Sequence, residues 1–301
     1  MVKTPIILDC DPGIDDVLAI VLAMAKDNLD IKAITTVCGN VSGEKTSRNA
    51  GLLLNALGSD IPLVQGSNIP LVKTHVSAGV HGSDGLGDMS HRLADVPYEH
   101  RSAKSAVELM AEILTDSKEP VTIVAVGPLT NVALLLHAFP HLKPKIKQIS
   151  IMGGGIELGN KTPHAEFNIY VDPEACHIVL NSGVEIVLAT LNATLQARLL
   201  KSDMDKFSFV SSEMTTFIHD IMWRYASLDS ALHDPVAILW VSNPELFETE
   251  AVHLQVVTSD DDRRGETYVV PNELPNVRVI TKVHRERVID EIAESFKTFN
   301  V

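Results

Sequence analysis

Four aspartates within eight residues, directly after the first apolar run, constrain this chain more than any other feature of its sequence. Asp9, Asp11, Asp15 and Asp16 follow the strand-like run Ile6–Leu8. Carboxylates this close together at the end of a buried strand repel one another, and burial further disfavours their charged forms. Helix capping accounts for one or two acids at a helix start, but not for four. We therefore expect a hard divalent cation with oxygen ligands, Ca²⁺ or Mg²⁺, to neutralise them.

Apolar runs of strand length alternate with segments of helical spacing through the first two-thirds of the chain. Such alternation predicts an α/β fold, an open, mostly parallel, Rossmann-like doubly wound sheet with helices on both faces and extra C-terminal helices. The predicted strands are 6–10, 31–38, 121–126, 146–152 and 185–190, with a hairpin of 252–258 and 266–270. The predicted helices are 15–26, 43–57, 103–115, 129–139, 172–181, 203–225, 233–241 and 286–297.

Composition and net charge indicate which kinds of partner the protein can bind. The 301 residues carry 25 basic and 39 acidic side chains, a net charge of −14, so a phosphate-tracking groove for nucleic acid is not expected. No apolar run is long enough to span a membrane, and no signal peptide is recognised. Three cysteines without metal-site spacing suggest reduced core thiols. We expect a cytoplasmic protein with one domain over residues 1–301, in which the long irregular stretch 66–97 forms a binding loop.

Polar and small residues recur directly after the predicted strands. In a doubly wound sheet, ligands sit beyond the carboxyl ends of the strands, so these residues would share one edge. The residues in question are Asp9 and Asp11, Gly39-Asn40, Gly127-Pro128, Gly153–Gly155 and Leu191-Asn192. Glycines there also serve as ordinary turn residues, and the aspartates are the stronger signal.

Several motifs in family order identify a resemblance that covers essentially the whole chain. The stretch from Asp9 to Asp16 resembles the N-terminal signature of the inosine–uridine-preferring nucleoside hydrolases. Within that family the chain looks most like the broad-specificity ribonucleoside hydrolases, through residues 39–42 and 44–46. The supporting segments are 36–41, 126–131, 152–155, 165–168, 171–175 and 233–235.

The resemblance implies a Ca²⁺-dependent hydrolase, with one ion per subunit, that cleaves the N-glycosidic bond of purine and pyrimidine ribonucleosides in nucleoside salvage. By position, the ion's ligands would be Asp11, Asp16, the carbonyl of Val126 and Asp234. Asp234 also stands where a helix N-cap is expected, and the two roles are compatible. Asp11 would act as general base on a water molecule, with an oxocarbenium-like transition state. Family members are commonly homodimers or homotetramers.

The same resemblance assigns the substrate contacts. Ribose recognition would fall to Asp15, Asn40, Asn160, Glu166 and Asn168, with the Met152 carbonyl nearby. The remaining assignments concern the base: Phe167 for stacking, His233 for protonating or binding the leaving base, His81 for a base or 5′-hydroxyl contact, and Ile221 with Tyr225 for the pocket wall. Each assignment has a purely structural alternative. A buried aromatic side chain more often belongs to the core, and most of the 12 histidines must be structural or exposed.

Two other functions compete with this interpretation. A phosphatase that used Asp9 as nucleophile would want a hydroxyl residue two places after Asp11, where Gly13 stands. A non-catalytic, calcium-dependent nucleoside-binding protein would keep the site without turnover. All the proposed catalytic positions hold competent residues, which favours an enzyme.

Overall fold

The computed structural model describes residues 3–207 and 212–300. Its centre is an eight-stranded sheet with strand order β3-β2-β1-β4-β5-β6-β10-β7, in which only β7 runs antiparallel to its neighbour. The strands are β1 (Thr4–Cys10), β2 (Leu29–Thr36), β3 (Leu63–Gln65), β4 (Val121–Ala125), β5 (Ile146–Met152), β6 (Ile186–Ala189), β7 (Phe247–Val252) and β10 (Val277–Val283). A separate hairpin pairs β8 (Leu254–Val256) with β9 (Thr267–Val269). The predicted α/β, mostly parallel architecture is confirmed.

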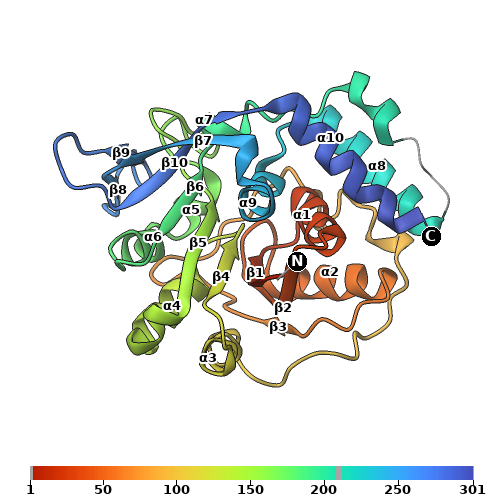
Figure 1. The fold of residues 1–301 in the computed structure, drawn as a ribbon, viewed down its shortest axis with the longest axis horizontal. Coiled ribbons are helices and arrows are strands. Elements are labelled where there is room, and N and C mark those ends of the chain that lie inside the picture. The colour runs from red at the N-terminus through yellow and green to blue at the C-terminus, as the bar shows by residue number, and fades with distance from the viewer. Residues whose placement is uncertain (1–2, 208–211, 301) are drawn as a thin grey trace.

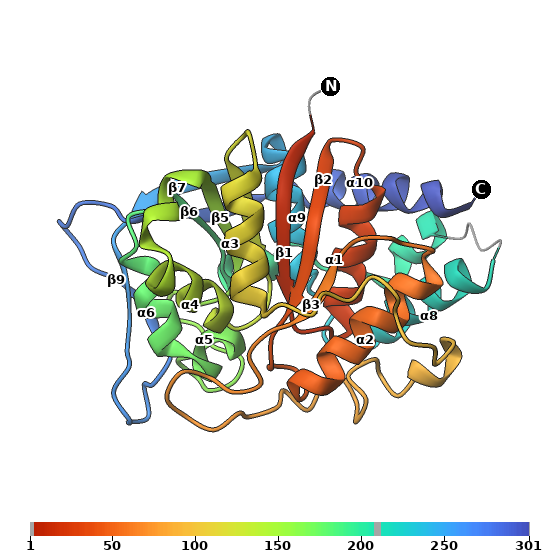
Figure 2. The same ribbon diagram turned by 90° about the horizontal axis from the view of Figure 1, so that it is seen from below.

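Helices cover both faces of this sheet (Figures 1 and 2). The α-helices are α1 (Ile14–Ala25), α2 (Gly43–Ala56), α3 (Ala106–Asp116), α4 (Thr130–Ala138), α5 (Phe167–Val171), α6 (Pro173–Leu180), α7 (Leu191–Thr194), α8 (Glu213–Leu228), α9 (His233–Ser242) and α10 (Arg285–Phe296). Helices α1, α9 and α10 contribute to one apolar core, and α3, α4 and α6 pack into the core on the other face. The strands between them are buried on both sides, which explains their nearly continuous apolar runs.

One predicted element was wrong, and three strands were missed. The expected single helix over 203–225 is a 3₁₀ turn at Lys201–Phe207 followed by α8, and its residues 208–211 lie outside the described part. Helix α8 starts late because the Ser212 hydroxyl accepts a hydrogen bond from the Thr215 amide, as an N-cap does. Strands β3, β7 and β10 were not predicted. The first is only three residues long, and β7 exposes Glu248 and Glu250 along the sheet edge.

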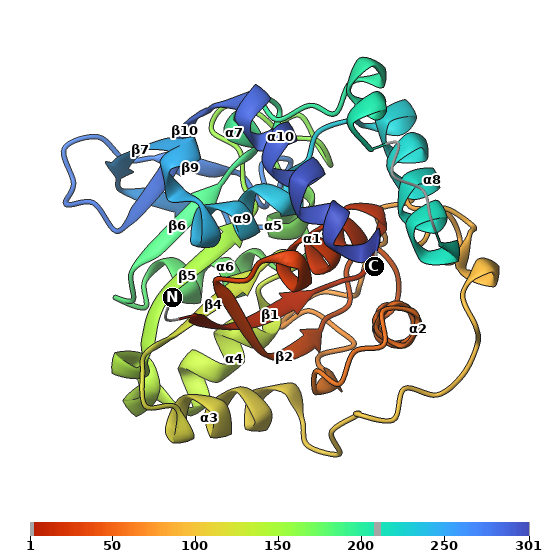
Figure 3. The ribbon, with the colours of Figure 1, turned by 45° about the vertical axis from the view of Figure 1, so that its right-hand side comes forward.

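The long stretch between β3 and α3 is irregular, as predicted, apart from a 3₁₀ turn at Ser90–Arg92. Figure 3 shows it passing beside α8 at the periphery of the molecule. Ion pairs fasten the two segments, Arg92 to Asp220 and Arg224 to Asp88. No described helix combines the length and the apolar character needed to cross a bilayer.

Strand order places a ligand crevice at the centre of the sheet. The chain leaves β1 toward β2 and β3, then returns to the other side of β1 with β4. The two halves therefore diverge between β1 and β4, which is the switch point where doubly wound folds bind ligands. Asp11 and Val126 come directly after these two strands.

Candidate functional site

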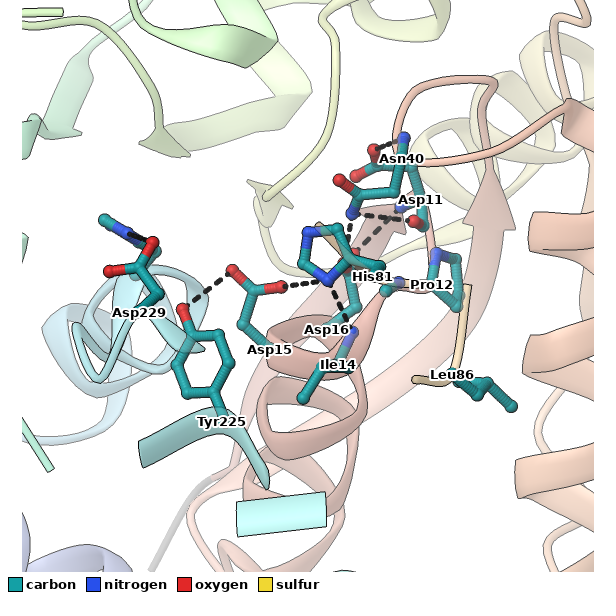
Figure 4. A network of polar contacts seen from close by, with 12 residues as sticks. Asp11, Pro12, Ile14, Asp15, Asp16, Asn40, His81, Leu86, Tyr225 and Asp229 are labelled. Atoms are coloured by element: carbon teal, nitrogen blue, oxygen red, sulfur yellow. Dashed lines mark hydrogen bonds and ion pairs between the residues drawn. The ribbon is translucent and has the colours of Figure 1, made fainter. Parts of the chain in front are cut away.

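The turn between β1 and α1 is organised by Asp16, which lies in the first turn of the helix. One carboxylate oxygen accepts a hydrogen bond from the Asp11 amide at 2.9 Å, and the other accepts from the Gly13 amide at 2.9 Å. The Asn40 side-chain amide donates to Asp16 at 3.0 Å and to the Asp11 carbonyl at 3.1 Å. Figure 4 shows these contacts converging between β1 and the segment after β2. The turn thus holds two of the aspartates in fixed positions.

Asp11 is fully buried, and only one of its carboxylate oxygens is hydrogen-bonded. Oδ2 accepts from the Asn40 backbone amide at 2.6 Å, whereas Oδ1 has no hydrogen-bond partner among the described residues. Two glycines make room for it: a Cβ on Gly39 would lie 2.0 Å from Oδ2, and one on Gly127 would lie 2.5 Å from Oδ1. The glycines that follow β2 and β4 therefore have a steric reason, because a side chain at either position would clash with Asp11.

Asp9 has a different role from the other aspartates. Its Oδ1 accepts hydrogen bonds from Thr35 Oγ1 at 2.5 Å and Asn131 Nδ2 at 2.8 Å. Burial raises the pKa of Asp9 to about 7, although these two bonds oppose the shift. Asp9 does not line the central cavity. Its hydrogen bonds connect β1 to β2 and to α4.

A buried acidic cluster lies at the carboxyl end of β1. Asp15, Asp16 and Asp234 each bring one oxygen within 4.8 Å of the others, and Asp234 comes from the start of α9. Burial, together with the charge of neighbouring carboxylates, raises the pKa of Asp16 to about 7 and that of Asp11 and Asp234 well above the usual range. Asp15 Oδ1 and Asp9 Oδ2 likewise accept no hydrogen bond from the described residues, although His81 Nδ1 lies 3.9 Å from Asp15 Oδ1. This donor set fits a divalent cation, because buried charges require pairing or metal coordination.

The sequence-based ligand set and this cluster overlap but are not identical. Asp16 and Asp234 belong to both, while the structure brings Asp15 rather than Asp11 into the group of three. The Val126 carbonyl, the fourth predicted ligand, accepts a hydrogen bond from Asn168 Nδ2 at 2.8 Å. The same amide reaches the Met152 carbonyl at 3.2 Å. Asn168 therefore bridges the ends of β4 and β5 beside the acidic cluster.

Glu166 is positioned by the short helix α5, whose N-cap it forms. Its carboxylate accepts hydrogen bonds from three backbone amides, those of Gly154, Asn168 and Ile169, at 2.8–3.1 Å. Burial outweighs these bonds and raises the pKa of Glu166. Asn160 Oδ1 accepts from the Phe167 amide at 2.9 Å. Residues 165–168 are thus buried against the site, whereas Asn160, Pro163 and His164 stay exposed.

His81 comes from the long loop and is held against the start of α1. Its Nδ1 accepts a hydrogen bond from the Ile14 amide at 3.1 Å and lies 3.9 Å from Asp15. Burial lowers the pKa of His81 despite the charge of Asp15. Because Nδ1 is an acceptor, the neutral ring carries its proton on Nε2. His81 is therefore a fixed hydrogen-bond donor.

Both ring nitrogens of His233 are engaged. Nδ1 contacts Thr194 Oγ1 at 2.7 Å, and Nε2 contacts Asp229 Oδ2 at 3.3 Å. Burial opposes protonation, but the hydrogen bond and charge of Asp229 outweigh it and raise the pKa of His233. The neighbouring Tyr225 hydroxyl donates to the Ala231 carbonyl at 2.5 Å and lies 3.3 Å from Asp15 Oδ2.

A cavity of about 320 Å³ joins these groups, a size at the lower end of small-molecule sites. Asp11 and Asp16 are not among its lining residues, and neither is Ile221, which is fully buried on α8. The predicted residues that do line it are Asp15, Asn40, His81, Val126, Met152, Asn160, Glu166, Phe167, Asn168, Tyr225, His233 and Asp234.

Sequence reasoning missed several residues of the site. Val80, Leu228 and Asp229 line the cavity, and Thr194 holds the His233 ring. Asp229 lies between α8 and α9, outside both predicted helices, so helical spacing did not point to it. Thr194, in the short helix α7, offered no sequence signal either.

Comparisons with known proteins agree with this geometry. Residues 6–290 match the family model "Inosine-uridine preferring nucleoside hydrolase". The pyrimidine-specific ribonucleoside hydrolase RihA of Escherichia coli is 41% identical over 310 residues, covering 98% of this chain and 99% of the relative.

Solved structures show the same likeness. A plant nucleoside hydrolase, PpNRh1, superposes with a TM-score of 0.89 at 31% identity, covering 98% of this chain and 99% of the other. A purine-preferring ribonucleoside hydrolase from Gardnerella vaginalis superposes with a TM-score of 0.90 at 27% identity, covering 99% of each. With its fold, its buried acidic cluster and these relatives together, the chain belongs to the inosine-uridine preferring nucleoside hydrolase family and is a ribonucleoside hydrolase.

Proposed function

We propose that the chain hydrolyses both purine and pyrimidine ribonucleosides to ribose and free base, with one Ca²⁺ per subunit. The observation that carries this proposal is the buried cluster of Asp15, Asp16 and Asp234 beside a cavity of nucleoside-binding size. Asp11 Oδ1 and Asp15 Oδ1 accept no hydrogen bond from the described residues. The relatives' names include both a pyrimidine-specific and a purine-preferring enzyme, so both base classes belong in the test.

The residues that would hold the cation are Asp11, Asp16, Asp234 and the Val126 carbonyl. Carboxylate and carbonyl oxygens without cysteine or histidine favour Ca²⁺ or Mg²⁺ over zinc. When bound, the ion would hold the ribose diol and lower the pKa of a water molecule. The Asn168 amide would keep the Val126 carbonyl oriented, since it already bonds to that oxygen.

Ribose recognition would use groups that the fold has already oriented. Asn40 is held by Asp11 and Asp16, Glu166 by three backbone amides, and Asn160 by the Phe167 amide. Preoriented donors and acceptors of this kind fix three hydroxyls without further ordering cost. Asp15 and the Met152 carbonyl, which also line the cavity, complete the set.

Asp11 would serve as the general base. Its Oδ2 is tethered to the Asn40 amide, and its Oδ1 remains available to take a proton from water. Departure of the base leaves positive charge on the ribose, and the surrounding carboxylates stabilise that charge. Removing Asp11 should cost more than the roughly 10²–10⁴ of a single general base, because a ligand is lost with it.

The leaving base would meet two histidines. His233 is the expected proton donor, and to reach the base its Nε2 must exchange the contact with Asp229 for one with the substrate. His81 offers Nε2–H as a second donor, with its tautomer set by the Ile14 amide. Phe167, which lines the cavity, would stack on the base.

The test measures reducing-sugar release from inosine, adenosine, uridine and cytidine by wild type, Asp11→Asn and a control, Asp30→Asn. Asp30 is a half-buried acid on β2 that pairs with Lys32 and does not line the cavity. We expect turnover by wild type and the control, and a loss beyond roughly 10⁴ in Asp11→Asn. Binding without ribose release in wild type would leave only a calcium-dependent nucleoside-binding protein, and near-normal turnover of Asp11→Asn would defeat the assigned mechanism.

We further propose that this single domain, residues 1–301, works in the cytoplasm as a homodimer or homotetramer in nucleoside salvage. Its three cysteines are free and buried, which suits a reducing compartment. Exposed Ile69 and Val72 are apolar side chains that subunit contact would cover. Light scattering of the purified protein measures the subunit number, and a monomer at micromolar concentration would contradict the assembly.

A further inference from the structure

Asp229 lines the cavity where α8 ends, in contact with the His233 ring. Figure 4 shows it beyond Tyr225 and Asp15, on the side opposite Asp11 and Asn40. It lines the cavity together with Leu228. We propose that Asp229 is a specificity-determining residue that accepts a hydrogen bond from an N–H group on the outer edge of a pyrimidine base. This inference rests on the proposed function, because it assumes that the ribose sits at the acidic end.

The orientation of a nucleoside in the cavity places that edge near Asp229. Ribose is attached to N1 of a pyrimidine, and the N3–C4 edge lies across the ring from N1. With the ribose held among Asn40, Asn168 and Glu166, this edge would point away from Asn40, the direction in which Figure 4 shows Asp229. There uridine presents its N3–H and cytidine its C4 amino group, both donors for a carboxylate.

Asp229 retains acceptor capacity for such a contact. Its side chain is 41% exposed, and its two side-chain contacts are long: 3.3 Å to His233 Nε2 and 3.4 Å from the Ala231 amide. An ionised carboxylate offers about four acceptor positions, so at least two stay open. The Asp229 backbone is fixed meanwhile, since its amide donates to the Tyr225 carbonyl and its carbonyl accepts from Arg198.

The side chains next to Asp229 are less suited than its carboxylate to accept a hydrogen bond from the base edge. Leu228 and Val80 are apolar and more than half exposed, and the Tyr225 hydroxyl is committed to the Ala231 carbonyl. His233 shares its Nε2 with Asp229 itself. A site built to bond an N–H group rejects analogues that lack it, because the polar group is then left unpaired.

The test compares substrates that differ only in the donor. Uridine is paired with 3-methyluridine, and cytidine with the riboside of pyrimidin-2-one, which lacks the amino group without added bulk. Values of kcat/KM are measured for wild type, Asp229→Ala and the control Asp220→Asn, an acid on α8 that pairs with Arg92 and does not line the cavity. For each pair, the ratio of the two kcat/KM values is compared between proteins. This comparison cancels the intrinsic reactivity of the leaving groups, because that reactivity is the same for every protein.

The kcat/KM ratio of the intact to the donor-deleted substrate should be about tenfold to a hundredfold larger in wild type and Asp220→Asn than in Asp229→Ala. That difference is the effect of one hydrogen bond to a charged group. Equal ratios in wild type and Asp229→Ala would overturn the inference. A uniform loss in Asp229→Ala on all four substrates would likewise overturn it and show that Asp229 only positions His233. If wild type released no ribose from any substrate, the proposed function itself would fail, which is a separate outcome.

Discussion

Adding one methyl group at Gly39 should disable the enzyme while leaving it folded. Gly39 follows β2, and a Cβ there would lie 2.0 Å from Asp11 Oδ2, 2.8 Å from Asp11 Cγ and 2.8 Å from Pro128 Cδ. Real Cβ atoms essentially never come within 3.0 Å of another atom, so the Asp11 carboxylate must move by about 1 Å (3.0 minus 2.0). The backbone itself tolerates alanine, because Gly39 is not among the glycines with positive φ.

The size of the effect follows from that displacement. A misplacement of about 1 Å in a catalytic group costs on the order of 10²-fold in rate, or about 2.7 kcal/mol of transition-state stabilisation. In Gly39→Ala we therefore expect kcat/KM on inosine and uridine to fall by at least this factor. Affinity for Ca²⁺, measured by isothermal titration, should fall as well, since Asp11 is a proposed ligand.

A matched control separates catalysis from stability. Gly58→Ala adds the same methyl group where nothing lies within 4 Å, but at a φ of +60°. It should lose about 1 kcal/mol of folding free energy and keep its activity. Circular dichroism and thermal melts would establish that both variants are folded. A folded Gly39→Ala protein with kcat/KM within threefold of wild type would refute the argument that Asp11 needs this space.

Three further outcomes are expected. Ca²⁺ at 100 times its Kd should stabilise the chelator-treated protein by about 2.7 kcal/mol, which is measured as a higher melting temperature. The variant Asp16→Asn should lose this response. A wild-type protein whose melting temperature did not respond to Ca²⁺ would argue against the site. Burial lowers the pKa of His81 in the folded state, so the contribution of His81 to folding stability should fall as pH drops below about 6.5, whereas Asp9 and Asp16, whose pKa is raised to about 7, act in the opposite direction. Between pH 7.5 and 5.5 the free energy of unfolding in urea should therefore fall more, or rise less, in wild type than in His81→Asn, and identical changes in the two proteins would contradict the shift. Tyr225→Phe, which removes the hydroxyl bonded to the Ala231 carbonyl, should lower the free energy of unfolding by about 1 kcal/mol or more.

Much of this protein could be predicted from local sequence because the evidence lay within single segments. Alternating apolar runs and helical patterns indicated the parallel sheet, and glycines and carboxylates directly after strands indicated its ligand-binding edge. Strand β5, for example, spans 146–152 as predicted. The motif from Asp9 to Asp16 marked the family, since the spacing of its acids follows from one strand end and one helix start.

Only the tertiary structure decided which of these side chains face the cavity and what they contact. Asp9 and Asp11 are two residues apart, yet packing of β2 and α4 against β1 engages Asp9 with Thr35 and Asn131. Thr194 and Asp229 reach His233 from separate elements, and the rotation of α8 buries Ile221 in the core instead of exposing it to the cavity. Local sequence carries backbone preference and hydrophobic period, whereas helix rotation and contacts between distant segments depend on how the whole core packs.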